Sequence, residues 1–486
     1  PWTVMCAYNR VNGTYASEHA ELMTAILKEE WGHEGLVITD WGATSNRVAG
    51  LEAGVEVEMP GTFSGNDADI AAAVRSGRIA EAVLDKAAAR ILELIARVAP
   101  APAQSGETFD AVAHHALARR AAEEGTVLLK NDGALLPLTG KRCVALLGRF
   151  AREPRYQGAG SSLVNPSRLD TLYGALCERL GENCVSYSPG YDEVGEGVDD
   201  AAIASALECC DGADTVVICA GLTDRYEIEG LDRTHLDLPP GHVALIEAVA
   251  AVHQRVVVLL SNGSPVLMPW LDQVAAVVEC YLGGQAAAGA VANILCGDVN
   301  PSGKLAETFP LQLEDTPCHG CFPGGPATVE YRESLYVGYR YSDSADQPVL
   351  FPFGHGLSYT SFAYRDLHLS RERMCETDEL IVRVEVTNIG PMAGREIVQV
   401  YVRPLEASAY RPEKELKGFD KVGLAPGETA TVTVALGRRA FSHYDPGCAA
   451  WVVEAGAFEI LVGASSGDIR QRATIHVTAP QLAVPA

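Results

Sequence analysis

The stretch "GLVITDWGAT", residues 35–44, decides the fold class of the first part of this chain. Leu36, Val37 and Ile38 form an apolar run, as a buried parallel strand requires because both of its faces are covered. Asp40 follows this run almost directly. Because a carboxylate is costly to desolvate unless it is paired or hydrogen-bonded, we expect Asp40 at the open end of the strand, facing a cleft. In α/β folds, ligands bind at this end of the strands.

Strand-like and helix-like segments alternate on both sides of this stretch, up to about residue 98. A strand is expected in "WTVMCAYN" (2–9) and another in "VEVEMPG" (55–61), with a helix in "SEHAELMTAILKEEWG" (17–32) that Ser17 can cap. This alternation indicates part of a βα-barrel. The Ala/Pro/Gly-rich segment "VAPAPAQSGE" (98–107) then predicts a domain boundary, and a helix is expected after it.

A second α/β domain and a β domain are predicted beyond that boundary. Five near-continuous apolar strands separated by helices predict an open, mostly parallel sheet covered on both faces; they are "CVALLG" (143–148), "CVSYSPG" (184–190), "TVVICAG" (215–221), "RVVVLLSNG" (255–263) and "VAAVVECYLGG" (274–284). Neither a dinucleotide nor a phosphate-loop motif occurs, which argues against a nucleotide site. Beyond "FPFGHGLSY" (351–359), period-two segments such as "LIVRVEVTN" (380–388) predict an immunoglobulin-like or fibronectin-like β-sandwich.

Charge and cysteine content restrict the partners of the chain. Its 38 basic and 63 acidic residues give a net charge of -25, which disfavours nucleic acid and anionic membrane surfaces. The sequence has no apolar run long enough to span a membrane. Most of the 13 cysteines lie in apolar runs and are expected as buried, unpaired thiols, which favours a cytoplasmic location. Cys318 and Cys321 have metal-ligand spacing, but no second pair completes a zinc site, so neither a metal nor another cofactor is expected.

Nine motifs in order give the chain a resemblance to a known family. They are "VMCAYNRVNG", "LKEEWGHEGLVITDWGA", "EGTVLLKNDGALLPL", "YQGAGSSLVNP", "YEIEGLDRTHLDLP", "GDVNPSGKLAETFP", "YRESLYVGYRYSD", "FPFGHGLSYTSF" and "RPEKELKGFDKV". Together they resemble the glycoside hydrolase family 3 β-glucosidases over essentially the whole chain. The resemblance implies a multidomain α/β chain whose parts are a partial (β/α)8-type barrel (1–98), a linker and helix (99–125), an α/β sandwich with the acid/base loop (126–330), a connector (331–350) and a fibronectin type III-like domain (351–486).

The resemblance also implies an activity. It implies a retaining β-glycosidase that removes terminal β-D-glucosyl residues from β-glucosides or oligosaccharides by double displacement. Since a complete barrel takes about 250 residues, the chain is expected to be truncated at its amino terminus, to lack upstream sugar-binding residues and to be inactive alone. A β-xylosidase, an N-acetyl-β-glucosaminidase and a catalytically inactive carbohydrate-binding protein on the same scaffold stay as alternatives, and the oligomeric state stays open.

Two carboxylates carry the expected chemistry. Asp40 matches the nucleophile of the family; the alternative reading is a loop aspartate that caps the helix predicted at "TSNRVAG" (44–50). Glu229 matches the glutamate that precedes glycine in the family's acid/base string, and Glu227 is its rival. For Glu229 and Glu227, the alternative reading is a solvated acidic loop without a catalytic role. Arg233 is expected to brace this loop by pairing with a carboxylate.

Three further residues are candidates for binding the sugar. By resemblance, Tyr8 orients the nucleophile, Trp41 forms part of the wall of the sugar site, and Ser161 in "YQGAGSS" contacts the sugar. Each has a structural alternative: a solvent-facing hydroxyl for Tyr8, core packing for Trp41 and a simple glycine turn around Ser161.

Overall fold

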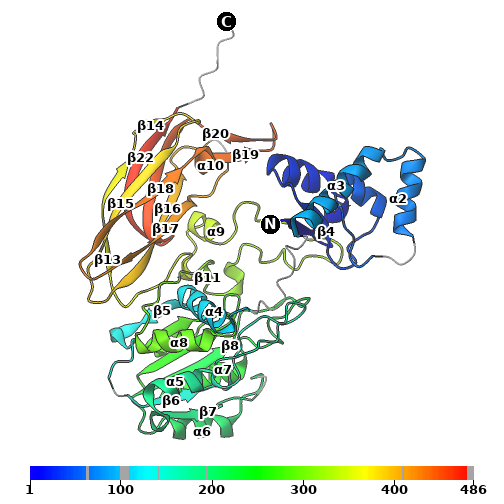
Figure 1. Cartoon of the computed structure of the whole chain (residues 1–486). Coiled ribbons are helices and arrows are strands. Elements are labelled where there is room, and N and C mark those ends of the chain that lie inside the picture. Colours follow the sequence, from blue (N-terminus) through cyan, green and yellow to red (C-terminus); the bar gives the residue numbers. More distant parts are fainter. Residues whose placement is uncertain (62–64, 99–108, 141, 193–194, 408–409, 479–486) are drawn as a thin grey trace. The chain divides into compact units, whose positions relative to one another are not determined.

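The structure is a computed structural model that describes residues 1–61, 65–98, 109–140, 142–192, 195–407 and 410–478 (Figure 1). The chain divides into two compact units, Pro1–Phe109 and Asp110–Ala486, and each is described by itself. The predicted connector at residues 98–107 lies, apart from Val98, outside the described residues.

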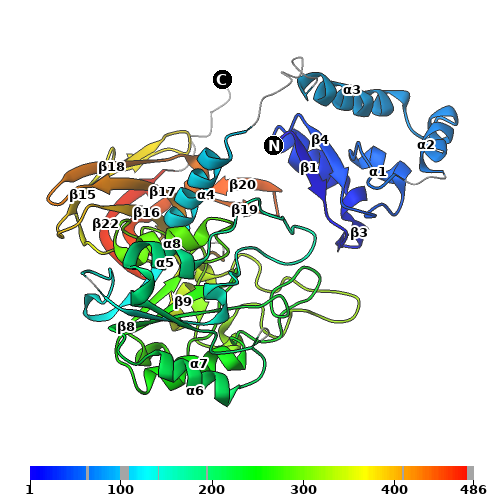
Figure 2. The ribbon, with the colours of Figure 1, turned by 60° about the horizontal axis from the view of Figure 1, so that its bottom comes forward.

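The first unit contains part of a βα-barrel. Strand β1 (Thr3–Cys6) pairs in parallel with β4 (Leu36–Thr39), and the two lie side by side in Figure 2. The segment predicted as a strand at residues 55–61 adds a single parallel bridge, between Ile38 and Val57. Val37, in β4, is fully buried, as the apolar run predicted. The partial-barrel prediction is therefore confirmed.

The helices of the first unit differ in part from the expectation. The first predicted helix is a 3-10 turn η1 (Ala16–Glu18) followed by a π-helix η2 (Glu21–Glu30). Ser17 caps neither of them: it is buried, and its hydroxyl donates to the Ala43 carbonyl at 3.1 Å. The remaining helices are α1 (Arg47–Ala53), α2 (Asn66–Arg75) and α3 (Glu81–Val98).

A short hairpin follows β1 and was not predicted. Strands β2 (Arg10–Val11) and β3 (Thr14–Tyr15) pair around Asn12 and Gly13, whose φ angles are +50° and +88°. An Asn-Gly pair with both φ angles positive is the preferred two-residue hairpin turn, so the sequence "RVNGTY" carried the signal.

The second unit begins with an open α/β domain. Its sheet has the strand order β5-β10-β9-β8-β6-β7. The bounds are β5 (Val127–Asn131), β6 (Val144–Leu147), β7 (Val185–Ser188), β8 (Thr215–Gly221), β9 (Val256–Ser261) and β10 (Ala276–Glu279). All neighbours are parallel except β5, which pairs antiparallel with β10. The mostly parallel sheet was predicted, whereas β5 was not.

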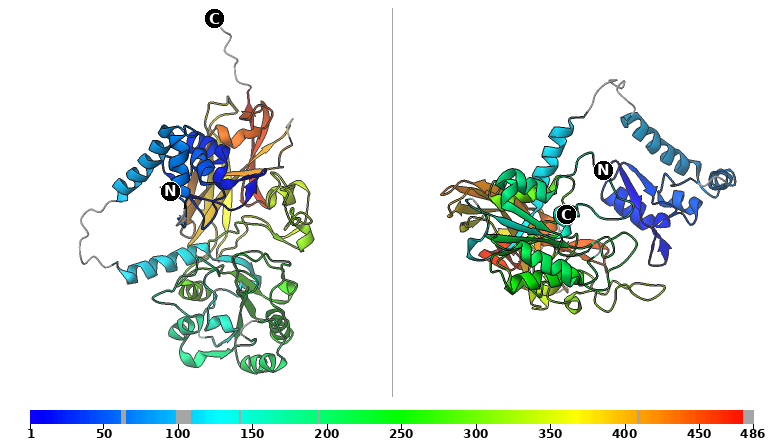
Figure 3. Two further views of the ribbon diagram at one scale, coloured as in Figure 1. Left: turned by 90° about the vertical axis from the view of Figure 1, so that its right-hand side faces the viewer. Right: turned by 90° about the horizontal axis from the view of Figure 1, so that it is seen from below.

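Helices cover both faces of this sheet (Figure 2). Helices α5 (Leu172–Leu180) and α8 (Ala287–Cys296) share one apolar core with the sheet, while α6 (Asp200–Cys209) and α7 (Pro240–Ala250) share the other. Helix α4 (Ala111–Gly125), drawn in cyan in Figure 3, is capped by Asp110 and contacts α8. The short elements within the α/β domain are η3 (Asp132–Ala134), η4 (Arg149–Ala151), η5 (Glu182–Cys184) and η6 (Leu271–Gln273). Between this domain and the sandwich, the sequence forms β11 (Phe309–Pro310), η7 (Leu313–Asp315), α9 (Tyr339–Ser344) and β12 (Val349–Phe351).

The last part of the chain is the predicted β-sandwich. One sheet has the order β13-β15-β18 and the other β14-β22-β21-β16-β17. The bounds are β13 (Phe362–Leu369), β14 (Arg373–Met374), β15 (Leu380–Asn388), β16 (Gly394–Pro404), β17 (Glu415–Leu424), β18 (Thr429–Leu436), β21 (Gly456–Ser465) and β22 (Asp468–Val477), with α10 (Arg438–Phe441), β19 (Ser442–Asp445) and β20 (Ala450–Val453) beside them. Alternate residues of the strands, such as Val384, Val400 and Ile460, face inward and form the core. None of the described helices is long and apolar enough to cross a membrane.

Candidate active site

Asp40 lies just beyond the carboxyl end of β4. Its backbone N–H donates to the Cys6 carbonyl at 3.2 Å, which extends the pairing with β1 by one residue. Its Oδ1 accepts two hydrogen bonds, from the Tyr8 hydroxyl at 2.8 Å and from the Trp41 backbone N–H at 2.6 Å. The helix-cap alternative is wrong, because Asn46 accepts from Val48 N and Ala49 N at the start of α1. Asp40 thus has a fixed oxygen and a location where an α/β strand presents functional groups.

The aromatic residues next to Asp40 are exposed within the first unit. Trp41 is 65% exposed and Tyr8 is 52% exposed. Core packing, the structural alternative for Trp41, is therefore wrong within this unit. The alternative for Tyr8, a hydroxyl directed only to solvent, is also wrong because this hydroxyl donates to Asp40. Both side chains are therefore partly exposed at the end of the strand pair that carries Asp40.

Glu229 lies on the loop that leaves the carboxyl end of β8. Its N–H donates to the Ala159 carbonyl at 3.2 Å, and its Oε2 accepts from the Ser161 backbone N–H at 2.6 Å. Ile228 also forms a parallel bridge with Ala159. The loop at residues 155–162, which contains "YQGAGSS" (156–162), and the loop at residues 222–233, which contains Glu229, therefore lie against each other. Ser161 is placed beside Glu229 through its backbone.

Gly160 allows this close approach. Its φ is +109°, and a Cβ built on it would lie 2.5 Å from Glu229 Cβ and 2.7 Å from Oε2. The glycine is therefore needed for its backbone conformation and for its missing side chain, which is more than the simple turn considered as the alternative.

Glu227, the rival of Glu229, binds the segment that follows the end of β9. Both of its carboxylate oxygens accept from the Gly263 N–H, at 3.0 and 2.9 Å, and Oε1 also accepts from the Ser264 hydroxyl at 2.9 Å. Arg233 was expected to pair with a carboxylate, and this expectation was wrong. Its guanidinium instead donates to the Ser264 hydroxyl and to the Pro265 carbonyl, both at 2.9 Å. Both side chains brace the loop against the segment after β9.

Two carboxyl groups close to this brace have raised pKa values. Burial, and next the Glu227 carboxylate, raise the pKa of Glu307 to about 7, while Arg233 opposes the shift. Burial raises the pKa of Glu279 well above its ordinary value, although the Tyr281 N–H and the Asn262 amide donate to its carboxyl group. Sequence analysis missed both residues. The available signal for Glu279 was a lone carboxylate inside the apolar run "VAAVVECYLGG".

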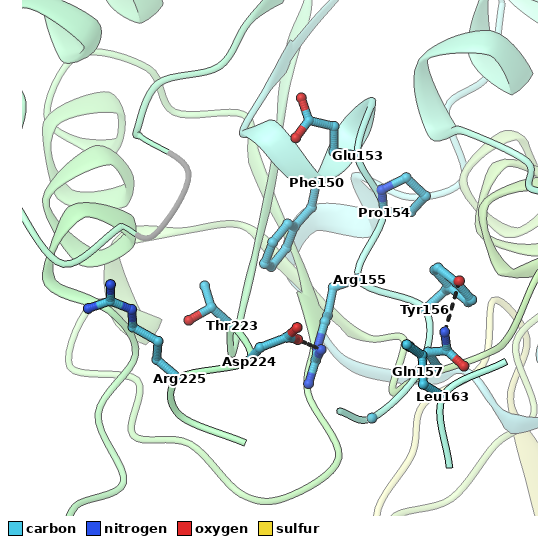
Figure 4. A pocket seen from close by; sticks show the side chains of 11 residues that line it. Phe150, Glu153, Pro154, Arg155, Tyr156, Gln157, Leu163, Thr223, Asp224 and Arg225 are labelled. Atoms are coloured by element: carbon cyan, nitrogen blue, oxygen red, sulfur yellow. Dashed lines mark hydrogen bonds and ion pairs between the residues drawn. The ribbon is translucent and has the colours of Figure 1, made fainter. Parts of the chain in front are cut away.

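A cavity of about 590 Å³ opens beside the two loops (Figure 4). Its lining residues come from the segments that follow β6 and β8, at the carboxyl edge of the sheet. They are Phe150, Glu153, Pro154, Arg155, Tyr156, Gln157, Gly158, Leu163, Thr223, Asp224 and Arg225. In Figure 4 the guanidinium of Arg155 points to the carboxylate of Asp224, with which it forms an ion pair. Arg155 was also missed, although it directly precedes "YQGAGSS". Across the described ranges, no group of His, Cys, Asp and Glu is arranged to hold a metal ion.

Comparison with known proteins identifies these parts. The first unit is part of a barrel and the second combines an α/β domain with a fibronectin-like sandwich, and Asp40 and Glu229 lie beyond strand ends of the barrel part and the α/β sheet. Residues 2–94 match the N-terminal domain of glycosyl hydrolase family 3, residues 126–359 match its C-terminal domain, and residues 396–466 match a fibronectin type III-like domain. The chain belongs to glycoside hydrolase family 3.

Several relatives are similar over nearly the whole chain. Over 98% of its length the chain is 49% identical to a thermostable beta-glucosidase B from Acetivibrio thermocellus and 40% identical to an exo-alpha-(1->6)-L-arabinopyranosidase from Bifidobacterium breve. The crystal structure of a β-glucosidase from Bifidobacterium adolescentis superposes with a TM-score of 0.94 at 41% identity, covering 98% of this chain and 70% of that one. The chain spans 63% of the length of each of the first two relatives.

Proposed function

We propose that this chain supplies the nucleophile and the acid/base of a retaining β-glycosidase that removes terminal β-D-glucosyl residues. The observation that carries the proposal is Asp40, a carboxylate at a barrel-strand end with one oxygen held by the Tyr8 hydroxyl and the Trp41 N–H. Its support from comparison is the beta-glucosidase relative at 49% identity. Retaining glycosidases need one carboxylate that attacks and one carboxylic acid that donates a proton.

The proposed reaction has two steps. First, the oxygen of Asp40 that is not held by Tyr8 attacks the anomeric carbon, while Glu229 gives its proton to the departing glycosidic oxygen. The glycosyl ester of Asp40 forms as the bond to the aglycone breaks. In the second step the Glu229 carboxylate takes a proton from water, the water oxygen attacks the anomeric carbon, and Asp40 leaves as a carboxylate. Trp41 and Ser161 are proposed to border the sugar.

The hydrogen bonds of the two glutamates favour Glu229 over Glu227 as the acid/base. Both oxygens of the Glu227 carboxyl group are engaged with the segment after β9, because they accept from the Gly263 N–H and one of them also accepts from the Ser264 hydroxyl. The side chain of Glu229 is exposed at the loop surface and receives the Ser161 N–H at one oxygen. A group that must give up and regain a proton in each cycle requires this accessibility.

Other members of the same enzyme class are distinguished by their substrates. A β-xylosidase and an N-acetyl-β-glucosaminidase stay as alternatives, and the 40% identical relative adds an α-L-arabinopyranosidase. An inactive carbohydrate-binding protein is the alternative outside catalysis. The test is to assay aryl glycosides of glucose, xylose, N-acetylglucosamine and arabinopyranose in parallel with the complete gene product. The glycoside with the highest kcat/KM identifies the activity. If none of the four is hydrolysed, the result favours the binding protein.

The proposal is tested by trapping the glycosyl-enzyme in the complete gene product. A fluorosugar glucoside inactivator should label Asp40 in peptide mapping, and Asp40→Ala should lose both labelling and hydrolysis because no other group forms the ester. Glu229→Ala should lose roughly 10²- to 10⁴-fold on poor leaving groups, with a smaller loss on activated aryl glucosides and formation of a β-glycosyl azide when azide is added. A label on another residue contradicts the nucleophile, and this behaviour in Glu227→Ala but not Glu229→Ala reverses the acid/base assignment.

For residues 1–486 expressed alone, we propose little or no turnover. Among the described residues of the first unit, β1 and β4 form a two-stranded sheet, and Trp2 and Met5 are exposed beside it. An open sheet edge leaves backbone groups unpaired and does not hold a substrate firmly near Asp40. Release of nitrophenol by this chain at the rate of the complete gene product contradicts the proposal.

A further inference from the structure

We propose that Arg155 is a positioning residue for the acid/base: it ties the loop at residues 155–162 to the loop at residues 222–233 and so fixes the direction of the Glu229 carboxyl group. This inference rests on the proposed role of Glu229. It concerns an interaction within the second unit alone.

Arg155 reaches from the first loop to two points on the second. Its side chain is 8% exposed, and one guanidinium nitrogen forms the ion pair with Asp224 shown in Figure 4. The other terminal nitrogen donates to the Glu227 backbone carbonyl at 2.9 Å. Asp224 and Glu227 lie five and two residues before Glu229, so the guanidinium holds the part of the loop that leads to the acid/base.

The same two loops meet again at Glu229 itself. Ala159 accepts the Glu229 N–H, and Ser161 donates its N–H to Glu229 Oε2 at 2.6 Å. The loops are therefore joined at two places, at Arg155 and around Ser161, with Glu229 at the second. If Arg155 is removed, the loop turns about the remaining contact, and the direction of the Glu229 oxygens changes. A small displacement of a proton donor is costly because proton transfer requires hydrogen-bond distance to the leaving oxygen.

The chemistry of the guanidinium is required for this task. Burial lowers the pKa of Arg155 and the nearby Glu227 carboxylate opposes that shift, so the group stays charged at every pH at which the enzyme is assayed. Its planar fork reaches a carboxylate and a carbonyl together. A lysine has a single ammonium centre and cannot reproduce both contacts in the same geometry.

A matched control lies three residues earlier in the same segment. The guanidinium of Arg152 lies over the rings of Tyr173 and Tyr187, at 4.0 and 4.1 Å from their centroids. These aromatic contacts hold the segment to the fold. Arg152→Ala therefore removes the same chemical group from the same segment, at a more exposed position, while leaving the Arg155 contacts with the second loop in place.

The experiment compares Arg155→Ala, Arg155→Lys, Asp224→Asn and Arg152→Ala in the complete gene product. We measure kcat and KM on dinitrophenyl β-glucoside, which needs little protonation, and on phenyl β-glucoside, which needs the acid. Arg155→Ala and Arg155→Lys should lose roughly 10- to 100-fold in kcat/KM on the phenyl substrate and about 3-fold or less on the dinitrophenyl one. The comparison uses kcat/KM because this ratio reports the first step, whereas hydrolysis of the glycosyl-enzyme is common to both substrates. On the phenyl substrate the loss should lie in kcat rather than in KM. Asp224→Asn should show the same selectivity more weakly, since Asp224 is 68% exposed at its side chain and its replacement does not threaten the fold.

Added guanidinium ion should partly restore Arg155→Ala on the phenyl substrate, while azide, which rescues Glu229→Ala, should not. Equal losses in kcat/KM on both substrates, or the same selectivity in Arg152→Ala, overturn the positioning role, and so does a loss on the phenyl substrate that is confined to KM. Glu229→Ala is assayed alongside. If it shows the selective loss and Arg155→Ala does not, the positioning role alone fails; if Glu229→Ala shows none, the acid/base assignment fails and the positioning role with it.

Discussion

Gly160 is the residue at which the two loops of the proposed acid/base site come closest. Its φ of +109° is unfavourable for a side chain, and its missing Cβ gives space to Glu229. Two residues earlier in the same string, at Gly158, a Cβ would meet nothing within 4 Å. The string "YQGAGSS" therefore contains one glycine that determines the geometry of the site and one that does not.

This pair gives a direct test of the site. Gly160→Ala should push Glu229 from its place and reduce kcat on phenyl β-glucoside by roughly 10-fold or more, because both backbone strain and a steric clash act on the proposed acid/base. Gly158→Ala should leave kcat within about 2-fold of the parent. Steady-state kinetics on both variants, with thermal unfolding to establish their folding, supplies the answer. Similar kcat values for the two variants would contradict the role of Gly160.

Glu307 gives the second unit a pH-dependent stability. Its pKa is raised to about 7 by burial and by Glu227, so the folded protein binds this proton more tightly than the unfolded chain does. Such a group contributes stability that is fully present below its unfolded pKa of about 4.5 and is lost as the pH rises through about 7.

Glu307→Gln should remove this pH dependence. The amide resembles the protonated acid, so the variant should match the parent near pH 5 and exceed its free energy of unfolding by about 2 kcal/mol near pH 8. Urea denaturation at the two pH values measures the difference, with the exposed Glu314→Gln as the control. A difference that does not grow between the two pH values would show that Glu307 is not the titrating group.

At the scale of secondary-structure elements, burial pattern decided what could be predicted. Most of the predicted parallel strands, β6, β8, β9 and β10, have apolar side chains on both faces, and their apolar runs revealed them. Strand β5 was missed because it follows helix α4 with a single residue between them and no turn signal. Strand β17 was missed for another reason: its sequence "ELKGFDKVGL" lies at the edge of its sheet and alternates weakly.

The first helix of the barrel part shows a limit of periodicity. Its apolar spacing indicated a helix correctly, but the π-helical hydrogen bond from Trp31 N to Ile26 O at 2.9 Å shifts which residues face inward. Lys28 is thereby buried and forms an ion pair with Glu56 at 2.5 Å. A spacing of 3.6 residues cannot anticipate this arrangement, since it depends on a carboxylate 28 positions later in the chain.

In the candidate site, too, local sequence patterns revealed some residues but not the contacts between distant positions. Asp40 and Tyr8 could be proposed from the sequence because each stands at the end of a strand that is itself recognisable, and family motifs named their roles. The connection of Arg155 to Asp224 and Glu227 spans about 70 positions and arises only when β6 and β8 become neighbours in the sheet. Local sequence patterns cannot predict such pairs of distant residues.

On the scale of the whole molecule, buried charges join the sandwich to the α/β domain. Lys304, just before β11, forms an ion pair at 3.4 Å with Glu396 of β16; their side chains are 10% and 5% exposed. Glu396 also accepts from the Tyr364 hydroxyl at 2.9 Å. Burial lowers the pKa of Lys304 and Glu396 opposes this shift. On α4, Glu124 pairs with Arg395 and Lys421 of the sandwich.

Removing one partner of the buried pair should destabilise both domains together. Glu396→Ala leaves Lys304 buried without its counter-charge and should cost about 3–5 kcal/mol of the free energy of unfolding. Calorimetry measures whether the unfolding of the α/β domain and of the sandwich shifts together. The control is Glu385→Ala, since Glu385 is exposed on β15 of the other sheet. Equal stability of the two variants would show that the pair does not couple the domains.

The two hydrogen-bond donors at Asp40 also bear on the synthesis of glycosidic bonds. In Asp40→Gly the Tyr8 hydroxyl and the Trp41 N–H still point at the place that Oδ1 occupied. Two donors that converge on an emptied position form a small anion site, and fluoride suits its size and charge. An α-glucosyl fluoride bound there would lose fluoride to these donors while Glu229 deprotonates an acceptor alcohol. The product, a β-linked disaccharide, would then accumulate, because the variant lacks the carboxylate needed to cleave it.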